Sequence, residues 1–308
     1  MVSPSQISEA SAHLGAGGLV AFPTETVYGL GAAARSPLAV RRIYAAKGRP
    51  AGHPLIVHLG SAEQAWQWGV ATDAARSLAD AFWPGPLTLI LKRAAWVPLE
   101  VTGGRETVGL RVPAHPVAQE LLAAFGDGIA APSANRFGQV SPTTADHDRA
   151  EFGAEVMVLD GGPCQVGIES TIVDLSGSVP AILRPGGVVE ADIVALVGAL
   201  GVSETVAPGT LAQHYAPRTS LHLAVDVSEA ARAFQARGLS VQTLPAGDPE
   251  DHAHRLYAEL RRLDALGVDV LVAEPSPHGG LGLAINDRLR RAAHAASFPQ
   301  AINAQPEE

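Results

Sequence analysis

Cysteine is nearly absent from this sequence, which has 308 residues and one cysteine, Cys164. A disulfide framework and a cysteine-based zinc site within a single chain are therefore excluded. The sequence has no uninterrupted run of about 18 apolar residues, so we expect no membrane span and no membrane partner. The first residues, MVSPSQISEA, lack the basic segment and the apolar stretch of a secretory signal. These absences favour a cytoplasmic location.

Positive charge and aromatic side chains are also scarce. The formal net charge is −9, and aromatic residues make up 5% of the chain. Nonspecific binding of nucleic acid needs a dense basic surface, so a protein that coats RNA or DNA is disfavoured. Only Lys47 and Lys92 are lysines among the 22 basic residues. A lysine retained in such an arginine-rich chain indicates a place that needs a compact ammonium group, although Lys92 could simply end a strand.

The balance of 47% hydrophobic and 17% charged residues is that of an ordinary globular protein. At this length two domains are expected. In the first part of the chain, short apolar runs alternate with amphipathic helical periods, and proline or glycine marks most junctions. The predicted strands are 18–22, 54–59, 86–92, 107–112, 128–133, 156–160, 170–175 and 181–184, and the predicted helices are 6–16, 37–46, 61–82, 115–125 and 190–200.

A change of pattern after residue 200 separates a second, smaller region. We interpret residues 204–217 as a linker, because they contain prolines and polar residues without a clear period. The domains are then residues 1–203 and 218–308. In the second, strands at 220–225, 239–244 and 268–273 alternate with helices at 227–237, 249–266 and 281–296. This order predicts a small parallel-sheet α/β domain.

The segment FPTETVYGLGAAA (22–34) is rich in hydroxyl groups and glycine and follows a predicted strand. Its glycines fit a loose dinucleotide-binding pattern, but they lie too far beyond the strand, and no acidic residue follows at the required distance. The phosphate-binding pattern G-x-x-x-x-G-K-[ST] is absent. We therefore interpret the segment as a ligand-binding loop at the end of a strand, with an ordinary turn as the alternative.

Three cations lie in segments that suggest anion binding. Lys47 and Arg49 are two residues apart in a Gly/Pro-rich loop, where they repel each other unless an anion lies between them. The simpler explanation is that cations are favoured near the C-terminal end of a helix. We expect both to be exposed. Arg111 lies in an apolar strand and needs a partner, which is either a ligand carboxylate or a structural acid. His53 and His58 have no third donor at metal-ligand spacing.

Two further segments carry small polar groups next to strands. AAPSANRFGQVSPTT (130–144) offers Ser133, Asn135 and Ser141, and its backbone amides could hold an anion; a solvated loop is the alternative. GIESTIVD (167–174) contributes Ser170, and ILRPGG (182–187) contributes Arg184 at the end of a strand. None of these segments is decisive alone.

Taken in order, FPTETVYGLG, KGRP, HPLIVH, WPGPLTLIL, GLRVPAHP, APSAN with SPT, ESTIVD and ILRPG resemble the YrdC-like family. APGTLAQHYAP (207–217), followed by a small α/β domain, is similar to the two-domain branch of that family, the threonylcarbamoyl-AMP synthases. The resemblance is dense over residues 5–217 and continues to 280–293. It implies an open twisted α/β sheet in the catalytic domain, followed by a small Rossmann-like parallel-sheet domain. The C-terminal region is short for this branch.

The resemblance also implies an activity, in which L-threonine, bicarbonate or CO2, and ATP yield threonylcarbamoyl-AMP and pyrophosphate, the first step of a tRNA modification. Lys47 and Arg49 would be the catalytic cations, Mg2+ would bridge the ATP phosphates without a dedicated protein metal site, and the product would pass to a tRNA threonylcarbamoyl-transferase complex, with at most weak direct tRNA contact. The threonine side would comprise Thr24, Thr26, His58, Arg111, Ala131 and Ser170. The ATP side would comprise Lys47, Arg49, His53, Thr107, Ser133, Asn135, Ser141, Arg184 and Tyr215.

Two alternatives and one conformational prediction remain. A carbamoyl-transfer enzyme could contain the same domain, but the extra cysteine clusters of such proteins are absent. An RNA-binding module could use the sheet, but stacking aromatics are few. Leu211, His214 and Tyr215 would gain by docking on a surface, so we predict that the linker is a lid over the site. The alternative is that Tyr215 packs permanently between the domains.

Overall fold

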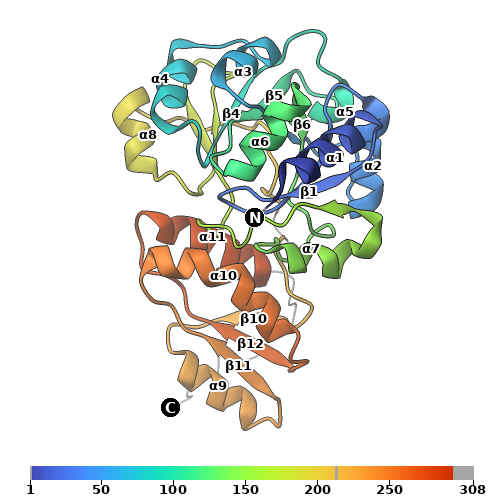
Figure 1. The fold of residues 1–308 in the computed structure, drawn as a ribbon. Helices are drawn as coiled ribbons and strands as arrows, with labels where there is room; N and C mark the ends of the chain where they lie inside the picture. The colour runs from blue at the N-terminus through green and yellow to red at the C-terminus, as the bar shows by residue number, and fades with distance from the viewer. Residues whose placement is uncertain (1, 212–213, 294–308) are drawn as a thin grey trace.

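The computed structural model describes residues 2–211 and 214–293, which form two α/β bodies (Figure 1). The large body contains a nine-stranded mixed sheet of strand order β7-β1-β2-β6-β3-β5-β4-β8-β9, and the small one contains a three-stranded sheet of order β10-β12-β11. Parallel pairs in the large sheet are β1–β7, β3–β5 and β4–β8. Its strands are β1 (Val20–Phe22), β2 (Gly29–Ala33), β3 (Ile56–His58), β4 (Leu87–Lys92), β5 (Thr107–Arg111), β6 (Ile129–Ala130), β7 (Met157–Val158), β8 (Thr171–Asp174) and β9 (Ala181–Arg184).

The helices of the large body begin at polar caps. Ser36, for example, accepts a hydrogen bond from the backbone N–H of Ala39 at the start of α2, and Gly48, with φ of +63°, ends that helix. The chain thus leaves α2 directly after Lys47. The helices are α1 (Pro4–Gly15), α2 (Pro37–Lys47), α3 (Ala62–Trp68), α4 (Asp73–Phe82), α5 (Leu99–Thr102), α6 (Pro116–Phe125), α7 (Ala145–Phe152), a 3-10 turn (Gly153–Glu155) and α8 (Glu190–Val197).

The two faces of the large sheet bury different sets of side chains, because side chains alternate along each strand. On one face, Ala21, Val57 and Ala130 join a core with α2, α3 and α4. On the other, Val20 and Phe22 pack under α1 and α6. Further along this second face, isoleucines from β3, β4 and β8 pack against Ala207. The segment after α8 therefore covers part of this face.

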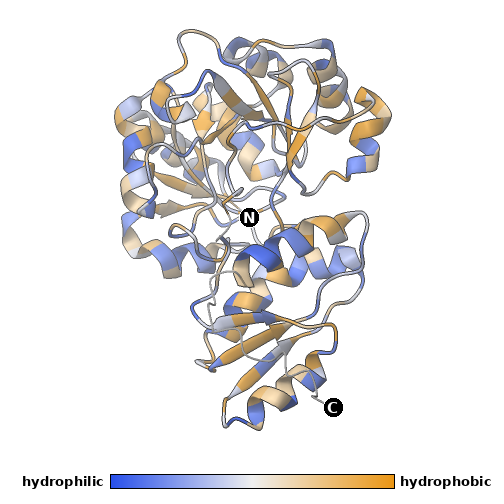
Figure 2. Cartoon of the chain, turned by 180° about the vertical axis from the view of Figure 1, so that it is seen from behind, coloured by the Kyte–Doolittle hydropathy of each residue, from blue (hydrophilic) through white to orange (hydrophobic). Residues whose placement is uncertain are grey.

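The small body packs against the large one through two helices. Its three strands, β10 (Ser220–Leu223), β11 (Val241–Leu244) and β12 (Val270–Ala273), are parallel. In Figure 1, α10 (Pro249–Asp264) and α11 (Leu281–Ala293) lie between this sheet and the large body, and α9 (Val227–Gln235) lies at the far end. Hydrophobic residues of both bodies form one shared core. The helices carry hydrophilic and hydrophobic residues along their length (Figure 2), as expected for helices with one buried face.

The predicted α/β architecture and the parallel order of the small sheet are confirmed. Three details differ. The segment interpreted as a glycine-rich loop contains β2, the predicted helix 61–82 is two helices separated by residues 69–72, and neither α5 nor α7 was predicted. Residues 294–296 of the last predicted helix lie outside the described residues. The domain boundaries at 203 and 218 stay a prediction.

Candidate functional site

A cavity opens on the second face of the large sheet, beyond α1 and α6. The paired residues His58 and Arg111 of the parallel strands β3 and β5 reach it from the sheet. Loops and the linker complete the walls. The lining residues are Thr24, Thr26, Val27, Tyr28, Gly29, Arg49, Ile56, His58, Arg111, Ala131, Pro132, Ser133, Glu169, Ser170, Arg184, Pro208, Gly209, His214 and Tyr215.

Three arginines line the cavity, and protein oxygen atoms orient each of them. Arg49 donates to the carbonyl of Pro54 at 3.1 Å. Arg184 donates to the carbonyl oxygens of Ser170 and Pro208. Burial lowers the pKa of Arg49 to about 10 and lowers that of Arg184, yet both remain cationic at neutral pH. The wall is therefore strongly positive although the whole chain is acidic.

Arg111 is paired with a structural acid. Its Nη2 lies 2.7 Å from Oε1 of Glu25, and its Nε donates to the carbonyl of Gly85 at 3.2 Å. Glu25 Oε2 also accepts a hydrogen bond from the N–H of Ala114. The partner that the strand position required is thus a protein carboxylate, and the guanidinium still lines the cavity.

Lys47 lies behind the cavity wall. It is 3% exposed, and its Nζ donates to the carbonyl oxygens of Ser133 and Asn135. Burial, and next the nearby positive charge of Arg49, hold the pKa of Lys47 well below its usual value. Arg49 is itself only 7% exposed. The expectation that both cations are exposed was wrong. They are buried close together, and an anion between them would reduce the repulsion between their positive charges.

Four buried polar atoms of cavity residues make no hydrogen bond within the described part of the chain: Arg49 Nε, His58 Nδ1, His214 Nδ1 and Tyr215 Oη. Burial lowers the pKa of both histidines to about 3, so their rings are neutral near neutral pH. Buried polar groups in proteins are nearly always paired. Four such atoms around one cavity indicate a site shaped for a polar ligand.

The two threonines of the first loop both line the cavity. Their hydroxyl oxygens lie 2.8 Å apart, and Thr24 Oγ1 donates to the carbonyl of Val27. Ala131, Ser133 and Ser170 line it as well. The sequence did not settle which of the two threonines faces the site. In the structure both line the cavity.

Five predicted site residues lie outside the lining. Lys47 and Asn135 are one layer behind it, and the Asn135 amide donates to the carbonyls of Arg136 and Gln139. Ser141 donates to Glu169 at 2.7 Å. His53 packs edge-on against Phe137, and Thr107 lies at the start of β5, paired with Lys92.

Sequence reasoning assigned no role to Glu25, Tyr28 or Glu169. Glu25 and Glu169 lie within the motifs of the sequence analysis, but each forms an ion pair with an arginine that is distant in the sequence. Tyr28 lines the cavity, and its hydroxyl donates to the carbonyl of Gly162 at 2.7 Å. In the described residues no group of three or more His, Cys, Asp or Glu side chains could hold a metal ion. The helices that the structure describes include none able to cross a membrane.

Comparison with known proteins decides the family. The family described as telomere recombination matches residues 12–186, and the family described as threonylcarbamoyl-AMP synthase, C-terminal domain, matches residues 188–294. The threonylcarbamoyl-AMP synthase of Pyrococcus abyssi (strain GE5 / Orsay) is 39% identical, over 93% of this chain and 94% of its own. The chain belongs to the threonylcarbamoyl-AMP synthase family. The predicted family and enzyme class are confirmed.

Two further relatives agree with this assignment. The threonylcarbamoyl-AMP synthase of Bacillus subtilis (strain 168) is 39% identical, over 94% of this chain and 93% of its own. The crystal structure of P. abyssi Sua5 complexed with L-threonine has a TM-score of 0.90 and 39% identity, and covers 96% of both chains. The predicted fold, a large α/β sheet domain followed by a small parallel-sheet domain, is therefore confirmed over nearly the whole length.

Proposed function

We propose that this chain forms L-threonylcarbamoyl-AMP and pyrophosphate from L-threonine, bicarbonate or CO2, and ATP. The neutral amine of threonine adds to CO2 with loss of a proton, or to bicarbonate with loss of water, and gives a carbamate. A carbamate oxygen then attacks the α-phosphorus of ATP, and pyrophosphate leaves with the β- and γ-phosphates. This reaction needs a polar, positively charged, enclosed site that positions two substrates, and no covalent enzyme intermediate.

One observation carries the proposal: a single cavity combines three arginine side chains with four buried polar atoms that lack a partner within the described residues. The guanidiniums supply charge for a triphosphate and a carboxylate. The neutral His58 and His214 supply ring nitrogens that remain available for hydrogen bonds. Catalysis would then consist of positioning and of stabilising negative charge as it shifts to the leaving pyrophosphate.

The two substrates would occupy different parts of the cavity. Thr24 and Thr26, from the segment after β1, line the cavity with the paired residues His58 and Arg111 of β3 and β5. These four side chains would hold threonine, with Arg111 on its carboxylate. Arg49, Ser133, Arg184 and Tyr215 would border ATP. Lys47 would act on the phosphates through the 133–135 loop, whose carbonyls it holds.

A magnesium ion would fit beside this loop. Asn135 Oδ1 is buried and makes no hydrogen bond in the described residues, and it is the kind of oxygen donor that Mg2+ accepts. Together with the Ser133 hydroxyl, this oxygen would hold the ion. When bound, the ion would neutralise part of the triphosphate charge.

The linker would protect the product from water. Pro208, Gly209, His214 and Tyr215 wall one side of the cavity. Both a carbamate and the mixed anhydride are easily hydrolysed, so a wall that closes after substrate entry would raise the yield. The short life of such an anhydride also requires a transferase that consumes it, which we expect to act on tRNA. A cytoplasmic location and weak tRNA contact remain predictions.

Product analysis tests the proposal. Purified protein is incubated with ATP, MgCl2, bicarbonate and labelled L-threonine, and pyrophosphate and labelled adenylate are measured. We expect pyrophosphate release only when threonine and bicarbonate are both present. Equal release without threonine would refute the assignment, because the carbamate would then not be the attacking group.

A further inference from the structure

Glu169 faces the same cavity that has to receive ATP. Among the described lining residues it is the one carboxylate, and it is 6% exposed. A buried negative charge beside a polyanionic substrate opposes binding by Coulomb repulsion, which water screens poorly in an enclosed site. The site can contain Glu169 only if another group offsets its charge.

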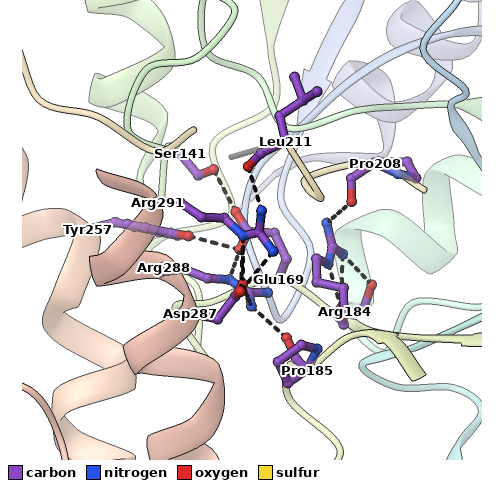
Figure 3. Close-up of polar contacts among 11 residues, drawn as sticks. Ser141, Glu169, Arg184, Pro185, Pro208, Leu211, Tyr257, Asp287, Arg288 and Arg291 are labelled. Atoms are coloured by element: carbon purple, nitrogen blue, oxygen red, sulfur yellow. Dashed lines mark hydrogen bonds and ion pairs between the residues drawn. The ribbon is translucent and has the colours of Figure 1, made fainter. Parts of the chain in front are cut away.

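Most of the groups that bind Glu169 come from the C-terminal domain (Figure 3). Arg288 of α11 lies with Nε 3.0 Å from Glu169 Oε2, and the hydroxyl of Tyr257 of α10 donates to the same oxygen at 2.9 Å. Ser141 donates to Oε1 at 2.7 Å. Burial would raise the pKa of this carboxyl, but Arg288 and then Arg184 outweigh it and lower the pKa to about 2. Glu169 is therefore ionised and paired.

Arg288 also contacts the wall that the linker forms. It is 1% exposed, its Nη1 donates to the carbonyl of Pro185 at 2.6 Å, and its guanidinium carbon lies 5.5 Å from the centre of the Tyr215 ring. One turn further along α11, Arg291 donates to the carbonyl of Leu211 and accepts at its own carbonyl from the N–H of His214. A single helix thus binds Glu169 and Leu211 of the linker (Figure 3). The same helix also binds His214 of the linker.

We propose that Arg288 is a positioning residue through which the C-terminal domain completes the ATP site: it neutralises Glu169 and holds it, together with Tyr215, against the cavity. This inference rests on the proposed function, since it concerns binding of ATP at that site. Without Arg288 the buried carboxylate keeps the hydrogen bonds of Tyr257 and Ser141 but has only Arg184 to offset its charge, and Arg184 then offers less positive charge to ATP. The C-terminal domain is then part of the site and more than a neighbour of it.

A charge-pair cycle tests the inference on the full chain. Arg288→Met, Glu169→Gln and the double variant are compared with the parent for the KM of ATP, the KM of L-threonine and the melting temperature. Arg288→Met should raise the KM of ATP at least about tenfold, with a threonine KM within about threefold of the parent. In the double variant the ATP KM should return to within about threefold of that of Glu169→Gln, because no buried charge is left unpaired.

Arg290→Met is the matched control, since Arg290 lies in the same helix but is exposed, and it should leave both KM values unchanged. If Arg288→Met does not fold, the double variant still decides. The inference would be overturned if the ATP KM of the double variant were about tenfold above that of Glu169→Gln. It would also be overturned if Arg288→Met raised the KM of ATP and the KM of threonine equally. Pyrophosphate release by the parent without threonine would instead count against the proposed function, while the ATP comparison between variants would still test Arg288.

Discussion

Replacing Arg111 with lysine tests how the cavity is divided between its substrates. Arg111 pairs with Glu25 at 2.7 Å, donates to the Gly85 carbonyl and lines the cavity. Lysine keeps the positive charge and can keep the pair with Glu25. It cannot also present the planar set of N–H groups that grips a second carboxylate. The change therefore removes part of the substrate contact without leaving Glu25 alone.

The expected magnitude follows from the contact that is lost. A hydrogen bond to a charged group contributes about 1.5–3 kcal/mol, and 1.36 kcal/mol corresponds to a factor of ten. The KM of threonine should thus rise about 10- to 150-fold, whereas the KM of ATP should change much less. Arg111→Met, by contrast, leaves Glu25 buried and unpaired, which costs about 3–5 kcal/mol of folding stability.

Steady-state pyrophosphate release, with each substrate varied in turn, measures both KM values, and calorimetry measures the melting temperature. Arg41→Lys serves as the control, because the Arg41 side chain is 54% exposed and pairs with Glu100 outside the cavity lining. A larger rise in the KM of ATP than of threonine would refute the assignment of Arg111 to threonine. A melting temperature as low in Arg111→Lys as in Arg111→Met would show that lysine does not preserve the pair.

Three further predictions concern other groups. Lys47→Met should lower both turnover and melting temperature, since Nζ holds the carbonyls of Ser133 and Asn135; a normal melting temperature would contradict this. Tyr215→Phe should lower turnover at an unchanged melting temperature, and ATP with threonine should protect the parent linker from proteolysis; equal cleavage with and without them would contradict a lid. Burial raises the pKa of Asp148 to about 8, so the stability that this carboxyl contributes is fully present below its unfolded pKa of about 4 and is lost as the pH rises from there to about 8. Between about pH 5 and pH 8 the melting temperature of Asp148→Asn should therefore fall less than that of the parent, and equal falls would refute this.

Elements with a strong apolar period could be predicted from the sequence, whereas β2 could not. Its residues GLGAA lack the branched and aromatic side chains that favour strands. β2 forms because it lies between β1 and β6, where a side chain on Gly31 would come within 2.7 Å of Ile129 and 2.8 Å of Phe22. The need for glycine therefore arises from tertiary packing, which local sequence does not reveal.

The cationic motifs of the site could also be found from the sequence, but not the partners of those cations. Arg111 was known to need a partner, yet Glu25 lies 86 residues away. Glu169 and Arg288 are 119 residues apart and belong to different domains. Such pairs depend on how the chain folds back on itself. The predicted exposure of Lys47 was wrong for the same reason. Lys47 is near a helix end, where cations are usually solvated, but the 133–135 loop covers it.

The choice of oxygen partners explains how an acidic protein can offer a cationic cavity. Arg49 and Arg184 are oriented by backbone carbonyls, which accept hydrogen bonds but carry no net charge. Their positive charge therefore remains available to a triphosphate. The two carboxylates nearby differ, since Glu25 pairs with Arg111 and Glu169 pairs with Arg288. Had Glu169 been left to Arg184 alone, it would have cancelled a charge that faces the cavity. A second arginine from α11 avoids this loss, and on this argument the small domain contributes to the electrostatics of the site as well as to its walls.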